Sequence, residues 1–399
     1  MKIAIVHPYP VHSGAVGGTT RVYALVRHLA SAGHVVTVLA HATGKAEADR
    51  AAVGDLASLG VSQRLFPLVK PPLRARLGWI SGPIPYYVHR NRSPSLEDEL
   101  ARIGPDLVHV EAGYLAPLLD RLDPRVPRTL AEQETMSLAV DRLRTARGRS
   151  PWELFLLTQR RKIAAFEQQA LTGFQRVWAI SAAEAEHLAR LLGRPVEILP
   201  HVVDTRSFQP GAEPAAAPRL LFVGNYAHRP NWHALLWLLS QVWPRIRAQV
   251  PEAQLEAVGP GLDAAKRERV ERAGGSAPGR VADLAAAYRG AAVFLNPIRS
   301  GGGMRGKVLE AFACGCAVVS TAMGMEGVEA RSGEHCLVAD TREEFASAVV
   351  RYLREPALRR EHGRAARALV ERNYDPGQVF PRLEAAFSEL IEQRRRSVA

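Results

Sequence analysis

Two successive series of apolar, strand-like runs and amphipathic helical segments follow one another along this chain of 399 residues. The first series occupies residues 2–200, and the second begins at Leu220. Long helices are expected over 151–170 and 231–250. Strands that alternate with helices predict a parallel sheet with helices on both faces. Because the chain is also too long for one comfortable hydrophobic core, we expect two doubly wound domains of the α/β class.

The segment 204–218 separates the two series. It contains several Pro and Ala residues and lacks hydrophobic periodicity, which is typical of a linker. We therefore expect an N-terminal domain over 1–203 and a C-terminal domain over 219–375. The final helix, 376–399, carries an apolar stripe, which fits a cap on its own domain or a crossing back to the first domain. Ligands of doubly wound sheets bind beyond the carboxyl ends of the strands, so the two domains should face a shared cleft.

Bulk composition is that of an ordinary globular protein, with 47% hydrophobic and 23% charged residues. No segment is long and apolar enough to span a bilayer. The opening apolar run is interrupted by His7 and Pro8, which does not fit a signal peptide. The sparse cysteines, Cys314, Cys316 and Cys336, fit neither a disulfide framework nor a zinc site. We expect a cytoplasmic protein with buried cysteines.

The formal net charge of +12 predicts a surface that attracts polyanions. No pattern typical of nucleic-acid binding accompanies this charge, so no nucleic-acid partner is expected. Two interpretations stay open. The arginines serve solubility, or they let the protein dock reversibly at the inner face of an anionic membrane. The oligomeric state does not follow from the sequence.

A glycine-rich loop between two apolar runs is the main candidate for a ligand site. It reads Asn296-Pro-Ile-Arg-Ser-Gly-Gly-Gly-Met-Arg-Gly-Lys-Val-Leu-Glu310. Glycines let backbone amides approach a phosphate, and a helix start adds free N–H groups. Arg305 and Lys307 suit a diphosphate, and Glu310, one turn further, suits a ribose diol. The loop therefore predicts a nucleotide-diphosphate site, and a second glycine loop at Gly17 and Gly18 is expected to face the same cleft.

At these residues the chain resembles the GT-B glycosyltransferases of the retaining family 4 type, over nearly its whole length. The most specific pieces are Lys307-Val-Leu-Glu-Ala-Phe-Ala-Cys-Gly-Cys-Ala-Val-Val-Ser-Thr321 and Gly324-Met-Glu-Gly327. The resemblance implies two Rossmann-like domains facing a central cleft. It also implies transfer of a sugar from a nucleotide-diphosphate sugar, such as a UDP- or GDP-sugar, to an acceptor hydroxyl with retention of anomeric configuration.

The resemblance also implies roles for individual residues. The donor would contact Gly17, Gly18, Gly302, Gly303, Met304, Arg305, Gly306, Leu309 and Glu310. Two cations, Arg229 and Lys307, would neutralise the leaving diphosphate. No cofactor or metal is expected, because these cations do that work and the chain lacks an Asp-x-Asp pair. Side chains near strand ends in the first domain would orient the acceptor: His109, Glu111, Glu132 and Glu134.

The chain departs from the family pattern at several of these positions. The family's second Glu, eight residues before Glu310, is replaced by Gly302, and the loop after the donor domain's first strand keeps Arg229 but no Lys. Cys316 stands where proline is usual, and His109 comes one position early. Two alternatives therefore stay open, a GT-B epimerase acting on the nucleotide-sugar itself and an inactive protein that binds a nucleotide-sugar or polyanion. The sequence does not decide between a glycan, a lipid-linked and a small-molecule acceptor.

Overall fold

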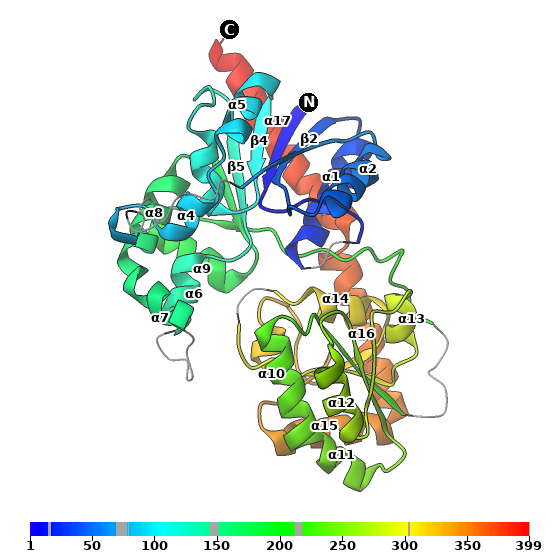
Figure 1. Ribbon diagram of the computed structural model, residues 1–399. Coiled ribbons are helices and arrows are strands. Elements are labelled where there is room, and N and C mark those ends of the chain that lie inside the picture. The colour runs from blue at the N-terminus through cyan, green and yellow to red at the C-terminus, as the bar shows by residue number, and fades with distance from the viewer. Residues whose placement is uncertain are drawn as a thin grey trace. The chain divides into compact units, whose positions relative to one another are not determined.

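The computed structural model describes residues 1–14, 17–68, 78, 80–143, 151–211, 218–301 and 304–398. The chain forms two compact units (Figure 1). The first consists of Met1–His201 together with Val379–Ala399, and the second of Val202–Gln378. The expected linker 204–218 thus falls within the second unit, and its residues 212–217 lie outside the described ranges.

The first unit contains a seven-stranded sheet in which all neighbouring strands are parallel. The strand order is β3 (Ser62–Phe66), β2 (Val35–His41), β1 (Lys2–His7), β4 (Leu107–Val110), β5 (Arg128–Glu132), β6 (Arg176–Ala179) and β7 (Glu197–Ile198). The order reverses between β1 and β4, which defines a doubly wound sheet. All residues of β4, and those of β1 after the exposed Lys2, are buried, because helices cover both faces.

The second unit contains a six-stranded sheet, also parallel. Its order is β10 (Ser276–Gly279), β9 (Gln254–Val258), β8 (Arg219–Val223), β11 (Val293–Asn296), β12 (Ala317–Ser320) and β13 (Leu337–Val338). The order reverses between β8 and β11, so this sheet is doubly wound as well. The expectation of two doubly wound α/β domains is confirmed.

Helices flank each sheet within its own unit (Figure 1). Those of the first unit are α1 (Gly18–Ser31), α2 (Ala46–Ala57), α4 (Tyr86–Arg90), α5 (Pro94–Ile103), η1 (Gly113–Leu119), α6 (Met136–Leu143), α7 (Pro151–Thr158), α8 (Arg160–Thr172) and α9 (Ala182–Leu192). Those of the second are α10 (Arg229–Trp237), η2 (Leu238–Val242), α11 (Trp243–Gln249), α12 (Ala264–Arg272), α13 (Leu284–Arg289), α14 (Gly306–Ala313), η3 (Met323–Met325), α15 (Arg342–Arg354) and α16 (Pro356–Asn373).

Two predicted helices differ in detail from the structure. The segment 151–170 forms two helices, α7 and α8, that are separated at Gln159. The helix that the sequence predicts over 231–250 begins two residues earlier, at Arg229. It contains the π-helical turn η2 shortly before Pro244. Proline has no N–H for the regular i→i−4 hydrogen bond, so a change in the hydrogen-bond pattern at this point has a direct cause.

The last helix, α17 (Pro376–Val398), leaves the second unit and packs on the first from Val379 onward. Its apolar stripe is buried there, with Phe380 and Phe387 fully inaccessible. Glu384 anchors the polar side, because its two carboxylate oxygens lie 2.9 Å from His28 Nε2 and 2.9 Å from His34 Nε2. The C-terminal segment is therefore part of the first unit's core.

Candidate functional site

The glycine-rich loop connects β11 to α14 in the second unit, at the carboxyl edge of the sheet. Of the predicted donor-binding residues, Gly302 and Gly303 lie outside the described ranges. Arg305 precedes α14 as its N-cap, and Gly306 is the first residue of the helix. Met304 is buried. Any phosphate bound at this helix start would meet free backbone N–H groups and the positive end of the helix dipole.

The Lys307 ammonium group is held by two oxygens, one at the end of β8 and one on α10. Its Nζ donates to Val223 O at 3.2 Å and to Asn231 Oδ1 at 3.0 Å. It also lies 4.7 Å from the centre of the Phe222 ring. Burial, together with the neighbouring Arg305, lowers the pKa of Lys307 to about 7. An anion bound beside it would favour the charged form and raise this pKa again.

Glu310 lies one turn beyond Lys307 on α14 and is held by the Tyr288 hydroxyl, which donates to Oε2 at 2.8 Å. Tyr288 is fully buried at the end of α13 and packs edge-on against Phe294. Burial raises the pKa of Glu310, and the Tyr288 hydrogen bond and Lys307 partly offset that rise. The second carboxylate oxygen, Oε1, has no partner among the described residues, so it remains available to a ligand.

Positive charge gathers around this helix start. The Arg305 guanidinium donates from Nη2 to Gly301 O at 3.0 Å. Arg229 is exposed at the first position of α10, next to His228, whose pKa is lowered by burial and by Arg305 and Lys307. Leu309, by contrast, is fully buried in the core, so only its backbone could meet a donor. The arrangement suits a polyanionic ligand.

Asn296, at the end of β11, is a residue of this region to which the sequence analysis assigned no role. Its buried Nδ2 donates to Ser320 Oγ at 3.0 Å and to Gly324 O at 2.8 Å. A Cβ atom at Gly324 would lie 2.4 Å from Ser320 Oγ, so only glycine fits there. The signal in the sequence is a polar residue that directly ends an apolar strand. This network fixes the turn after β12 against the end of β11.

In the first unit, the glycine loop ends at the start of α1. Gly17 is the N-cap of α1, with φ of 66°, a conformation that favours glycine. A Cβ atom at Gly18 would lie 1.4 Å from Gln133 Oε1, so Gly18 allows Gln133 to approach the helix start closely. Gln133 Nε2 in turn donates to Glu111 Oε2 at 3.0 Å. The loop therefore packs against a polar side chain that is held from the end of β4.

Glu111 and His109, predicted on the acceptor side, belong to a buried network instead of an open surface. Glu111 forms an ion pair with Arg21 of α1, and its Oε1 lies 3.2 Å from His109 Nε2. His109 Nδ1 lies 2.9 Å from Thr129 Oγ1. Burial alone would raise the pKa of Glu111, but Arg21 and His109 outweigh it and the pKa falls to about 2. Both side chains are inaccessible.

Glu132 and Glu134 differ in their surroundings. Glu134 is exposed, whereas Glu132 is buried at the end of β5 and accepts from Gly113 N at 2.7 Å. Two more buried carboxylates, Glu167 of α8 and Glu184 of α9, lie close enough to act on Glu132 electrostatically. Burial, followed by Glu167, raises the pKa of Glu132 to about 8. The structure thus brings together carboxylates from β5, α8 and α9, a grouping that the sequence analysis did not foresee.

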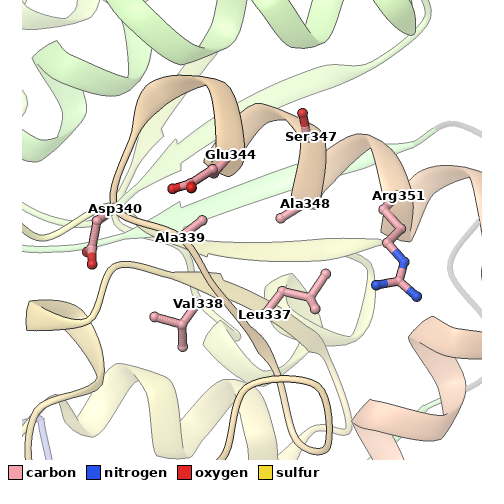
Figure 2. Close-up of a pocket in the computed structure, with 8 residues that line it drawn as sticks. All are labelled: Leu337, Val338, Ala339, Asp340, Glu344, Ser347, Ala348 and Arg351. Atoms are coloured by element: carbon pink, nitrogen blue, oxygen red, sulfur yellow. The ribbon is translucent and has the colours of Figure 1, made fainter.

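A separate shallow cavity of about 410 Å³ lies at the edge strand β13, beneath α15 (Figure 2). Its lining consists of Leu337, Val338, Ala339, Asp340, Glu344, Ser347, Ala348 and Arg351. No predicted site residue lines it.

Among the residues that the structure describes, no three His, Cys, Asp or Glu side chains are grouped so as to hold a metal ion. Within the same ranges, no helix combines the length and hydropathy that crossing a bilayer requires.

Two protein-family models match the chain in succession. Residues 16–207 match the model described as glycosyltransferase family 4, and residues 217–355 match the model described as glycosyl transferases group 1. The second match contains the loop, Lys307 and Glu310, and the first contains Gly17, Gly18 and the Glu111 network. The chain belongs to the family 4 glycosyltransferases. The family resemblance predicted from the sequence is confirmed.

Curated relatives of this family 4 protein match it in part. A protein of Klebsiella pneumoniae named "Uncharacterized 44.6 kDa protein in cps region" is 29% identical over 169 residues, which are 40% of this chain and 44% of that protein. A Streptomyces fradiae protein, 2-deoxystreptamine N-acetyl-D-glucosaminyltransferase, is 34% identical over 185 residues, 43% of this chain and 42% of that protein. The match spans less than half the length of each relative.

Solved structures share the fold of this family 4 protein over nearly their whole length. Sucrose-phosphate synthase from Thermosynechococcus elongatus superposes with a TM-score of 0.72 and 19% identity, over 98% of this chain and 99% of that chain. HepE from Anabaena, solved in complex with UDP, gives a TM-score of 0.70 and 13% identity, over 98% and 100%. These likenesses confirm the two-domain GT-B fold.

Proposed function

We propose that this protein transfers a sugar from a nucleotide-diphosphate sugar to an acceptor hydroxyl. The observation that carries the proposal is the pairing of Lys307 and Glu310 at the start of α14. An ammonium group that two neutral oxygens orient suits a diphosphate, and a carboxylate with one unpartnered oxygen suits a ribose diol. HepE has been solved in complex with UDP and with UDP-glucose, which supports UDP-sugars as the first donors to test.

The proposed reaction exchanges one bond at the anomeric carbon for another. The bond from this carbon to the diphosphate breaks, and the nucleoside diphosphate leaves with the electron pair. The acceptor oxygen bonds to the same face of the sugar, so configuration is retained, and its proton passes to the leaving phosphate. Arg229, Lys307 and the loop amides stabilise the departing charge without a metal, and one such donor is worth about 3 kcal/mol in the transition state.

The test is release of UDP or GDP from a panel of nucleotide-sugars, with mass detection of products. The panel includes an N-acetylglucosamine donor with 2-deoxystreptamine as the acceptor, because the Streptomyces fradiae relative is named a 2-deoxystreptamine N-acetyl-D-glucosaminyltransferase. Lys307→Ala should lower turnover by about 10²-fold or more. The exposed Lys45→Ala serves as the matched control and should leave turnover unchanged. Equal turnover in Lys307→Ala and wild type would contradict the proposal.

Two other outcomes of the same assay identify the alternatives. A changed nucleotide-sugar formed without any acceptor would indicate an epimerase. Tight binding of a nucleotide-sugar without turnover, across the whole panel, would indicate a binding protein. Gly302 motivates that second alternative, because it replaces the carboxylate that the family directs at the donor sugar.

We further propose that the protein acts in the cytoplasm and docks reversibly on anionic membrane beside a lipid-linked acceptor. In support, Trp152 and Leu154 of α7 are 47% and 50% exposed, and Arg161 is exposed at the start of α8. Lys162 Nζ donates to the carbonyl oxygen of Ile80, itself 43% exposed, at 2.9 Å. Interfacial aromatic residues beside basic ones suit an anionic lipid surface.

Co-sedimentation with liposomes tests the membrane proposal. Binding should require anionic lipid, weaken with salt, and fall in the double variant Trp152→Ser, Leu154→Ser. Ile198→Ser replaces a similarly exposed apolar residue on β7 and is the matched control. Binding that is indifferent to anionic lipid and to salt would contradict the proposal.

A further inference from the structure

Asn231 links the end of β8 to the start of α14 through its side-chain amide. Its Oδ1 accepts from Lys307 Nζ at 3.0 Å, and its Nδ2 donates to Asn225 O at 3.0 Å. The second bond settles which way the amide points, because only Nδ2 can donate to a carbonyl. The oxygen is thereby directed at the ammonium group.

The turn after β8 is shaped to accommodate this amide. A Cβ atom at Gly224 would lie 3.1 Å from Asn231 Cγ and 3.3 Å from its Nδ2. Gly224 therefore leaves the space that Asn231 occupies. The neighbouring carbonyl of Val223 accepts the second hydrogen bond from Lys307.

We propose that Asn231 is a positioning residue that holds the Lys307 ammonium group ready for the diphosphate of the donor, an inference that rests on the proposed function. An ammonium group has three hydrogens, and Asn231 Oδ1 and Val223 O accept two of them, which leaves one for a phosphate oxygen. Both acceptors are neutral. A carboxylate in place of Asn231 would pair with Lys307 and compete with the incoming diphosphate.

Other charged groups near Lys307 also shift its pKa, independently of Asn231. Arg305 lowers the pKa of Lys307, and Glu310 raises it. His228, at the N-cap of α10, interacts electrostatically with both Arg305 and Lys307. Strand β8 contributes Phe222 and Val223 at this point, which carry no charge. A substitution at Asn231 therefore changes Lys307 directly while these groups stay in place.

The experiment follows the lysine side chains by NMR of protein labelled with ¹³C at lysine Cε. The lysines are few, namely Lys2, Lys45, Lys70, Lys162, Lys266 and Lys307. Loss of one signal in Lys307→Ala assigns its resonance. In wild type the Lys307 signal should titrate near pH 7, its midpoint shifted by burial and by Arg305. Asn231→Asp should raise that midpoint by about one pH unit or more, because it adds a negative charge about 3 Å away.

A second variant and a matched control accompany this titration. Asn231→Ala removes the acceptor without adding charge and should lower both the Lys307 midpoint and the affinity for UDP, the latter about tenfold. Asn373→Asp makes the same chemical change beside Glu329 in the second unit and should leave the Lys307 midpoint unchanged. Circular dichroism confirms that each variant is folded.

The outcomes separate the two proposals. An unchanged Lys307 midpoint in folded Asn231→Asp and Asn231→Ala overturns the positioning role. If wild type releases UDP or GDP but Asn231→Ala binds UDP as tightly as wild type, the role is also overturned. If wild type binds neither UDP nor GDP while the midpoint still moves in Asn231→Asp, the contact stands and the proposed function fails.

Discussion

The Tyr288 hydroxyl donates to Glu310 Oε2 across 2.8 Å, from the end of α13 to the middle of α14. Tyr288 is fully buried, so the hydroxyl cannot turn to water instead. One oxygen of the carboxylate is thereby fixed, and Oε1 is left to a ligand. A carboxylate that is already oriented loses less conformational entropy on binding than one that rotates freely.

Substitution of Glu310 should weaken nucleotide binding. Because a hydrogen bond to a charged group is worth about 1.5–3 kcal/mol, Glu310→Ala should lower UDP affinity by about 10- to 100-fold. Tyr288→Phe removes only the orienting hydroxyl and should cost less, about three- to tenfold. Isothermal titration calorimetry with UDP measures both. Glu371→Ala, on the exposed face of α16, is the control and should leave UDP affinity unchanged. If Glu310→Ala binds UDP as tightly as wild type, the proposed ribose contact is ruled out.

The value of kcat/KM, which reports the free enzyme, should fall as pH rises through about 7. Burial and Arg305 lower the pKa of Lys307 to about 7, and only the protonated form neutralises a diphosphate. The active form therefore predominates below this pH and is lost above it. Lys307→Arg should remove this part of the pH profile, because a guanidinium stays charged throughout. The measurement is kcat/KM between pH 5.5 and 9, and identical profiles for wild type and Lys307→Arg would disprove the assignment.

The two glycines at the start of α1 should respond differently to alanine. Gly17 has φ of 66° and ψ of −141° but open space around it, so Gly17→Ala should destabilise by about 1–3 kcal/mol through backbone strain alone. At Gly18 the added Cβ displaces Gln133 and breaks its bond to Glu111, which costs about 1 kcal/mol.

A double-mutant cycle measures the contact between residues 18 and 133. The free energy of unfolding in urea is compared for wild type, Gly18→Ala, Gln133→Ala and the double variant. The cost of Gly18→Ala should nearly disappear when Gln133 is already alanine. The cost of Gly17→Ala should not change in the same background, which makes it the internal control. Fully additive effects at Gly18 and Gln133 would show that the two residues do not interact.

Stability of the first unit should decrease as pH rises from about 5 to 9. Burial and Glu167 raise the pKa of Glu132 from 4.5 to about 8, so the folded state binds this proton more tightly than the unfolded chain. The stabilisation is complete below pH 4.5 and is lost as the pH rises through 8. Glu132→Gln keeps an oxygen for Gly113 N and should flatten the dependence of Tm on pH. Parallel slopes for Glu132→Gln and wild type in thermal melts would contradict this prediction.

Central strands with a continuous apolar run could be predicted from the sequence. Lys2–His7 contains Ile-Ala-Ile-Val and Val293–Asn296 contains Val-Phe-Leu, and these residues are buried because helices cover both faces of a parallel sheet. The edge strands β3 and β10 were not foreseen. Ser62–Phe66 is largely polar, and Ser276–Gly279 contains a proline, because an edge strand is covered less and its pattern approaches that of a loop.

The candidate site likewise contains features that the local sequence determines and contacts that only folding determines. The spacing of Lys307 and Glu310 on one helix after a glycine-rich loop is a local property, so the sequence alone determined that a cation and a carboxylate lie one turn apart. The partners of these two residues are set by folding. Asn231 lies 76 residues from Lys307 along the chain, and Tyr288 lies 22 residues from Glu310. Only the tertiary structure decided that Lys307 is shared between two neutral oxygens and that His109 and Glu111 are buried. Such contacts depend on which strand ends meet at the edge of a sheet, and the pattern of a single segment carries no information about the segment that will pack beside it.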